Sequence, residues 1–149
     1  MANVVPYSFA QELLKGTHNF VGNTINLALY EAGSGAPYAV SDTAYSSGVA
    51  NQVGTSGTGY ATGGKTLQNG TVANQTNVAT VTFDTISWTS ATFGAAYGVL
   101  YNNSASDKLI VVLDFGGTKS CSNGTFTITF PSTSSGTPAG TDSLISITS

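Results

Sequence analysis

One segment has the spacing of a known catalytic motif. Gly59 to Thr66, GYATGGKT, matches the P-loop pattern G-x-x-x-x-G-K-[ST]. A P-loop binds phosphate because a buried strand delivers a glycine-rich loop to the N-terminus of a helix. Here the preceding residues, GVANQVGTSGT, are not a buried strand, and the following residues turn at Asn69-Gly70 and then read as a strand. We therefore interpret the segment as a glycine-rich loop or hairpin and not as a nucleotide site.

Nucleophilic catalysis would have to use His18 as the general base, because the chain has no other histidine. A lone histidine just after a short helix is typical of a capping or surface residue. Cys121 is the only cysteine, so an internal disulfide and a Cys-rich metal site are both excluded. It lies in a Ser/Gly-rich stretch with no nearby cation, and we expect a passive thiol.

The aspartates give no paired-carboxylate or EF-hand pattern. Four of them lie near presumed strand ends: Asp84, Asp107, Asp114 and Asp142. Asp114 is followed by Phe115 and Gly116, the kinase metal-binding triplet, but 149 residues are too few for a kinase domain. We expect Asp114 to hydrogen-bond the turn that follows it. The sequence predicts no enzyme, no cofactor and no metal site.

Charge is scarce along the chain. It has four Lys, no Arg and seven carboxylates, so charged residues make up 7%, where about 25% is usual. Nucleic-acid binding depends on Lys and Arg, so DNA and RNA are excluded as main partners. A weakly charged surface favours association, and we expect a homo-oligomer, a dimer or a trimer. Without an export signal or an 18-residue apolar run, we expect synthesis in the cytoplasm and no membrane partner.

Gly, Ser, Thr and Asn replace the missing charge and favour strands and turns over helices. We predict one all-β domain over residues 1–130, a β-sandwich or jelly-roll-like fold with a short N-terminal helix over about 8–16. Ser8 and Gln11 would form its capping box, and Gly16 would end it. Residues 131–149 are predicted to be a Ser/Thr/Pro-rich linker, including Ser132–Thr141, followed by a C-terminal edge strand or tail.

Alternation of apolar and polar residues predicts the strands. They are expected at Asn23–Tyr30, at Val78–Trp88 (one or two strands), at Phe93–Tyr101, at Leu109–Phe115 and at Phe126–Phe130. The continuous apolar run Leu109–Phe115 predicts burial on both faces, and Gly116–Asn123 predicts a turn. Between residues 38 and 64 we expect a long loop with short strand pieces at Tyr38–Val40 and Val49–Val53.

Most aromatic residues on the alternating strands, including Trp88, are predicted to be core. Residues in the loop-rich stretch are better candidates for an interface, because Tyr combines a large contact area with a polar tip. The interface candidates are Tyr38, Tyr45, Val49, Val53 and Tyr60.

The order of the segments carries a resemblance over roughly Phe9 to Phe130. The more recognisable pieces are Gly57–Gly64, Phe83–Trp88, Tyr97–Asn102 and Ile110–Phe130. Together they resemble a family of small virion structural proteins of tailed bacteriophages and prophages. The resemblance implies a head-decoration or tail-associated component of the virion, with the major capsid protein or other virion proteins as partners. It brings no catalytic residues.

We therefore expect a non-enzymatic virion structural protein, located in the virion as a capsid decoration (cement) protein on the major capsid shell. Two alternatives stay open. The first is a structural protein of the tail, neck or baseplate. The second is a carbohydrate-binding head fibre or adhesin that uses Trp88 or the loop tyrosines.

Overall fold

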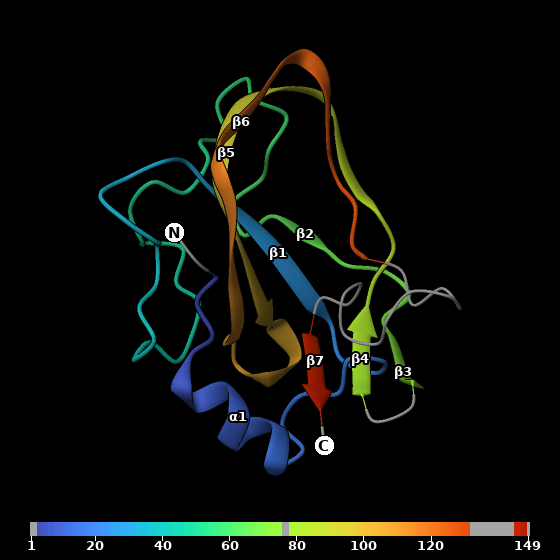
Figure 1. The fold of residues 1–149 in the computed structure, drawn as a ribbon. Coiled ribbons are helices and arrows are strands. Elements are labelled where there is room, and N and C mark those ends of the chain that lie inside the picture. Colours follow the sequence, from blue (N-terminus) through green and yellow to red (C-terminus); the bar gives the residue numbers. More distant parts are fainter. Residues whose placement is uncertain (1–2, 76–77, 132–144, 149) are drawn as a thin grey trace.

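Two antiparallel sheets make up the fold in the computed structural model, which describes residues 3–75, 78–131 and 145–148. Sheet A has the order β2-β1-β5-β6 and sheet B the order β3-β4-β7 (Figure 1). The elements are α1 (Tyr7–Leu14), β1 (Ile25–Tyr30), β2 (Lys65–Thr66), β3 (Thr71–Gln75), β4 (Val78–Thr82), β5 (Ile86–Asn102), the 3₁₀ turn η1 (Asn103–Ala105), β6 (Lys108–Ile128) and β7 (Ile145–Thr148). The predicted all-β, sandwich-like domain with one short N-terminal helix is confirmed.

β5 and β6 form one long two-stranded ribbon, paired from Asn102 and Lys108 at one end to Ile86 and Ile128 at the other. The half next to η1 lies beside β1 in sheet A, and the other half arches over and descends toward β4 (Figure 1). β5 therefore joins the end of the predicted strand Val78–Trp88 to the predicted strand Phe93–Tyr101. In the same way, β6 joins the predicted strands Leu109–Phe115 and Phe126–Phe130.

The predicted turn at Gly116–Asn123 is wrong, because β6 runs through it. Gly116 and Gly117 have positive φ, and the pairing with β5 shifts between Asp114 and Lys119. Since β5 continues alongside, the extra residues form a bulge that bends the ribbon instead of reversing the chain.

Helix α1 begins one residue earlier than predicted. Pro6 is its N-cap and makes no side-chain capping bond, so Ser8 lies inside the first turn and the predicted capping box is not formed. The predicted end at Gly16 is confirmed: Gly16 has a φ of +70°, and its N–H bonds the Leu13 carbonyl at 3.0 Å. The Thr17 N–H bonds the Glu12 carbonyl at 2.8 Å, which completes a Schellman motif.

The loop between β1 and β2 contains no strand, so the predicted pieces Tyr38–Val40 and Val49–Val53 are wrong. Only isolated bridges occur, between Tyr30 and Gln52 and between Ala44 and Lys108. The available edge explains this result. β2 already pairs with the first half of β1, at Asn26 and Leu27, which leaves the end of β1 at Tyr30 to pair with the loop.

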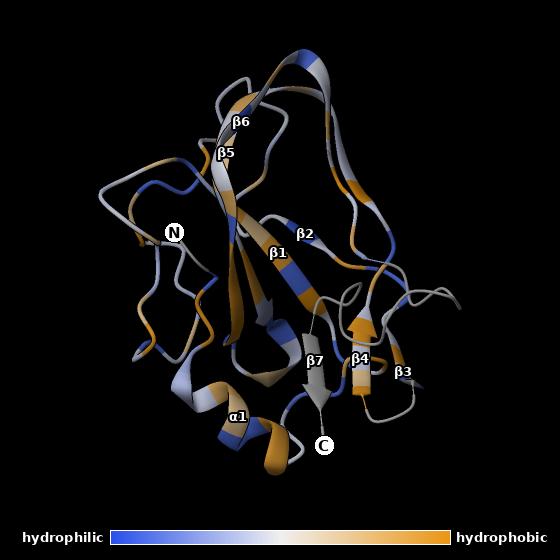
Figure 2. Ribbon diagram, viewed as in Figure 1, coloured by the Kyte–Doolittle hydropathy of each residue, from blue (hydrophilic) through white to orange (hydrophobic). Residues whose placement is uncertain are grey.

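Around β1, sheet A is buried on both faces. On β1, Leu27 and Leu29 face one hydrophobic cluster, while Ala28 and Tyr30 face the other. The first cluster also takes in Val81 and Phe83 beside sheet B, together with Trp88, which is 1% exposed as expected of a core residue. Figure 2 shows hydrophobic residues along β1 and a more mixed pattern over the top of the ribbon.

Burial at Leu109, Ile110, Val111 and Val112 confirms the strand predicted to be covered on both faces. At the other end of the chain, β7 pairs with β4 at the edge of sheet B, so the C-terminal residues form the edge strand and not a loose tail. The predicted linker Ser132–Thr141 lies outside the described residues.

Candidate functional site

The GYATGGKT segment is a loop that leads into a strand. Lys65 and Thr66 form β2, paired with β1, where a P-loop would begin a helix. The Lys65 Nζ donates a hydrogen bond to the Ser87 carbonyl at 2.6 Å and lies 5.5 Å from the centre of the Trp88 ring. The lysine therefore joins β2 to the returning end of the β5–β6 ribbon, and the loop interpretation agrees with the structure.

His18 is buried, so the prediction of a capping or surface residue is wrong. Its Nδ1 accepts a hydrogen bond from the Asn102 amide at 3.2 Å, which places the ring proton on Nε2, 3.0 Å from Glu12 Oε2. Lys108 Nζ lies 3.5 Å from the other oxygen of Glu12. This cluster holds α1 against the turn between β5 and β6.

Asn102 also donates to Asn23 Oδ1 at 2.9 Å, which fixes the segment that leads into β1. Among the hydrogen bonds of the described residues, none joins His18 to a Ser, Thr or Cys side chain that it could activate as a nucleophile. Its role in the fold is therefore to connect elements. The sequence could not reveal this, because the contact with Asn102 spans 84 positions.

The aspartates bind the turns beside them. Asp84 accepts from the Asn69 amide at 2.6 Å, and Asp107 accepts from the Asn103 amide at 2.8 Å. Asp114 accepts from the Gly116 N–H at 2.8 Å, as predicted. Asp142 lies outside the described residues. Within the part of the chain that the structure describes, no three His, Cys, Asp or Glu side chains gather as a metal ligand set.

Three of the five interface candidates lie in the core. Tyr38, Val53 and Tyr60 are 4%, 2% and 4% exposed, while Tyr45 and Val49 are partly buried. In this fold, the three buried side chains contact the protein's own sheet and leave no surface for a partner.

Tyrosine hydroxyls and rings fasten the loop to sheet A. Tyr45 stacks on Tyr101 with ring centroids 4.1 Å apart and planes within 7°. The hydroxyls of Tyr30 and Tyr38 lie 3.2 Å apart, and Tyr60 accepts from the Leu29 N–H at 2.9 Å. Burial raises the pKa of Tyr30, Tyr45 and Tyr60, and it raises that of Tyr101 to about 12.

The outer edge of β6 is the site that the sequence did not predict. β6 is an edge strand of sheet A. Near its start, Val112 exchanges two main-chain hydrogen bonds with Val4, of 2.9 and 2.8 Å, and the Asp114 N–H donates to Asn3 Oδ1 at 2.9 Å. From Phe115 to Ile128, no other strand of the described residues pairs with this outer edge. Within the described ranges, the edge is therefore covered at one end and has no strand partner over the rest.

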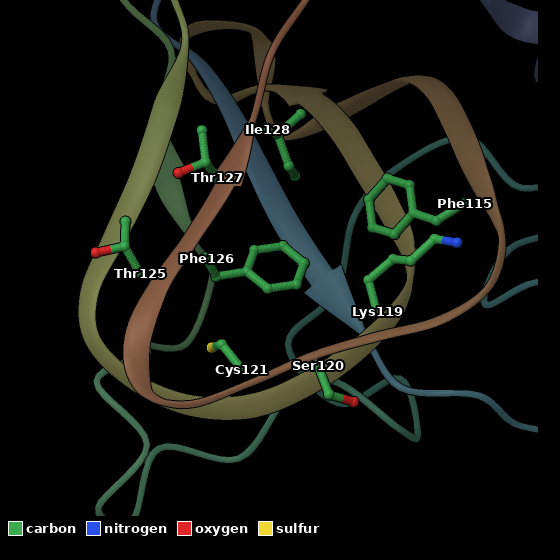
Figure 3. Close-up of a pocket in the computed structure, with 8 residues that line it drawn as sticks. All are labelled: Phe115, Lys119, Ser120, Cys121, Thr125, Phe126, Thr127 and Ile128. Carbon is green, nitrogen blue, oxygen red and sulfur yellow. The ribbon is translucent and has the colours of Figure 1, made fainter.

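A hollow of about 460 Å³ lies along the open part of this edge. Every residue that lines it comes from β6: Phe115, Lys119, Ser120, Cys121, Thr125, Phe126, Thr127 and Ile128. Figure 3 shows Phe115, Lys119 and Phe126 around the same space, enclosed by the bend of the strand. We call these eight residues the β6 hollow. It combines an apolar wall, several hydroxyls and one cation.

The β6 hollow could not be predicted from the sequence, because the residues Gly116–Asn123 have the composition of a turn. The only available signal was the alternation of Phe126 and Ile128 with Thr, next to a run of small polar residues. A run of small polar residues can be recognised as part of a strand only when the neighbouring strand is known to extend alongside it. Here β5 extends alongside Gly116–Asn123, and this is visible only in the pairing of β5 with β6.

No helix in the described ranges has the length and apolar character needed to cross a membrane. In comparisons with known proteins, no protein-family model, no curated protein and no solved structure matches this chain. The resemblance to phage virion proteins therefore depends on the sequence segments quoted above, and the geometry of the site has to be interpreted from its own residues.

Proposed function

We propose that this chain is a non-enzymatic structural protein of a bacteriophage particle that binds the major capsid shell as a decoration protein. The observation that carries the proposal is the open edge of β6 with the β6 hollow beside it. Strand edges of monomeric proteins are usually protected by charges, prolines or bulges. Between Phe115 and Ile128 this edge has its bulges but no proline, and Lys119 is its only charged residue. Such an edge is suited to contact another protein.

The polar side chains elsewhere support a structural role. Lys65 binds a main-chain carbonyl, His18 and Glu12 bind each other, and the loop tyrosines bind the sheet. Each of these groups is used to hold the fold together. The weakly charged surface and the resemblance to virion proteins favour the same conclusion.

Of the alternatives, a tail, neck or baseplate position would use the same surface, and the experiment below separates it from the capsid. A carbohydrate-binding platform has less support. Trp88 and Tyr60, two of its expected aromatic residues, are buried and cannot stack on a sugar in this conformation.

Particles that lack this protein provide the test. Purified chain is mixed with expanded capsids, and separately with tails, of the phage that encodes it. Bound copies are measured after sedimentation and located by cryo-electron microscopy. We expect saturable binding to capsids at repeated positions on the shell. Density confined to the tail would overturn the capsid assignment, and the absence of binding to either structure would overturn the proposal.

Light scattering of the isolated chain measures whether it is a dimer or a trimer.

A further inference from the structure

The outer edge of β6 already accepts an extended segment of polypeptide. Val4 pairs with Val112 in antiparallel geometry, with both main-chain hydrogen bonds formed, and the Asn3 side chain extends the contact to Asp114. The same edge then continues past the bulge to the β6 hollow without a partner among the described residues. Pairing of an added strand gives affinity through the main chain, and adjacent pockets give specificity.

The chemistry of the β6 hollow indicates which side chains it would take. Phe115 and Ile128, which are half-buried, provide apolar surface, whereas Phe126 is 6% exposed and packs against Phe93 in the core. The hollow has a volume of about 460 Å³ and is open to solvent. Ser120, Thr125 and Thr127 also line the hollow, and the Thr127 hydroxyl already lies 3.1 Å from the Ser87 hydroxyl on β5, so, within the described residues, the outer main chain of the strand provides the free hydrogen-bonding groups. An apolar side chain with a hydrogen-bonding neighbour therefore fits this surface.

Charge complementarity adds a third requirement. Lys119 is exposed and makes no ion pair or hydrogen bond among those of the described residues, whereas Lys65 and Lys108 both have partners. It is the only charged residue in the β6 hollow, on a chain whose net charge is −3. A carboxylate on the partner would be attracted to Lys119 and to no other charged group of the β6 hollow, so Lys119 would also set the register of binding.

We propose that the open edge of β6 binds an extended, acidic segment of a neighbouring protein in the particle. The segment places an apolar side chain against the half-buried Phe115 and Ile128 and a carboxylate opposite Lys119. This inference rests on the proposed function, and it names the chemistry of the partner and the residues that receive it.

Cys121 provides a direct test, because it is the only cysteine and it lines the β6 hollow. Its alkylation by N-ethylmaleimide is followed by mass spectrometry, for the free chain and for the chain bound to particles. We expect the rate to fall at least about tenfold on the particle, because only unoccupied hollows react. Sedimentation of the same samples reports docking. Loss of docking would contradict the proposed function, whereas docking with an unchanged alkylation rate would overturn only the inference.

Variants of Lys119 test the charge. Lys119→Glu should weaken docking at least about tenfold and Lys119→Gln about threefold, since reversal adds repulsion to the lost attraction. Lys15→Glu, a change of equal charge at the exposed end of α1, is the control and should dock normally. Urea unfolding verifies that each variant is folded. Equal effects of Lys119→Glu and Lys15→Glu would overturn the carboxylate assignment.

Protection of Cys121 from alkylation that grows with the concentration of the isolated chain would overturn the proposed partner in favour of a second copy.

Discussion

The Tyr60 hydroxyl accepts a hydrogen bond from the main-chain N–H of Leu29 at 2.9 Å. Leu29 lies in β1, whose edge is paired with β2 at only two positions, so a side chain from the loop supplies the acceptor that a neighbouring strand would otherwise provide. Gln52 donates to the same hydroxyl at 3.2 Å. One tyrosine thus satisfies a buried N–H and fixes the loop on the sheet.

Replacing Tyr60 with Phe removes this acceptor and leaves the buried Leu29 N–H without a partner. We expect the free energy of unfolding to fall by roughly 1–3 kcal/mol, the cost of a buried unsatisfied donor. Urea denaturation measures it. Tyr7→Phe is the matched control, because Tyr7 is 75% exposed, and it should change stability by less than about 0.5 kcal/mol. Equal midpoints for the two variants would contradict the assigned role of Tyr60.

Alkaline pH should weaken the attachment of the loop. Burial raises the pKa of Tyr101 to about 12 and also raises the pKa of Tyr30, Tyr45 and Tyr60 above the ordinary value of 10. Below pH 10 these tyrosines are neutral in both states. Between pH 10 and 12 the unfolded chain releases the Tyr101 proton that the folded chain retains, so this group lowers stability by at most about 1.4 kcal/mol per pH unit. The raised pKa of the other three tyrosines acts in the same direction.

Urea midpoints measured from pH 8 upward, together with tyrosinate absorbance, verify this dependence. Tyr101→Phe should make the decline above pH 10 shallower, because one of the retained protons is gone. The readout is the slope and not the stability at pH 8, which the variant also lowers by losing the hydrogen bond to the Gly63 carbonyl. A slope identical to that of the parent protein would contradict the assignment to Tyr101.

Local apolar patterns were enough to predict the core strands. The alternation at Ile25–Tyr30 and the continuous apolar run that begins at Leu109 both form strands, and the run is buried on both faces from Leu109 to Val112 as predicted. The predicted strands in the loop did not form because strand pairing there depends on a free edge. β2 pairs with Asn26 and Leu27, and only the end of β1 is left for the loop, which pairs there through the isolated bridge between Tyr30 and Gln52. The turn at Gly116 failed because local glycines permit a turn but also a bulge, and the register with β5 decides between them.

The candidate site was less predictable for the same reason. Lys119 and Phe126 are seven positions apart, and only the bend of the strand brings both to one hollow. The loop tyrosines gave the opposite error, because Tyr38 and Tyr60 were predicted to contact a partner and are buried in the core. A tyrosine among small polar residues is suited to a partner surface, but it is equally suited to hold its own loop on a sheet, as Tyr38 and Tyr60 do.

The glycines of GYATGGKT should matter for packing. Gly64 has a φ of +79°, and a Cβ on it would overlap the Leu27 carbonyl oxygen on β1. Gly64→Ala should therefore cost about 3 kcal/mol or more, or prevent folding. Gly57 has a similar φ of +70° but no atom within 4 Å of the added Cβ, so Gly57→Ala should cost only the backbone strain of roughly 1–2 kcal/mol.

Urea denaturation of the two glycine variants separates steric overlap from strain.

Addition of Mg-ATP should leave the thermal midpoint of the parent protein unchanged, because Lys65 is held by Ser87 and no helix follows Thr66. A rise in the midpoint with Mg-ATP would restore the interpretation as a nucleotide site.

Docking should depend only weakly on salt, because the surface proposed for it contains one charged residue, Lys119. Between about 0.1 M and about 1 M NaCl the screening length falls from roughly 10 to 3 Å, enough to remove an exposed ion pair. Such a pair contributes about 0.2–1 kcal/mol, so the dissociation constant should change by no more than about fivefold. Lys119→Gln should remove most of that dependence. Complete release of the parent protein from particles in high salt would mean that several ion pairs hold it, which contradicts an interface built from hydrogen bonds and apolar contacts.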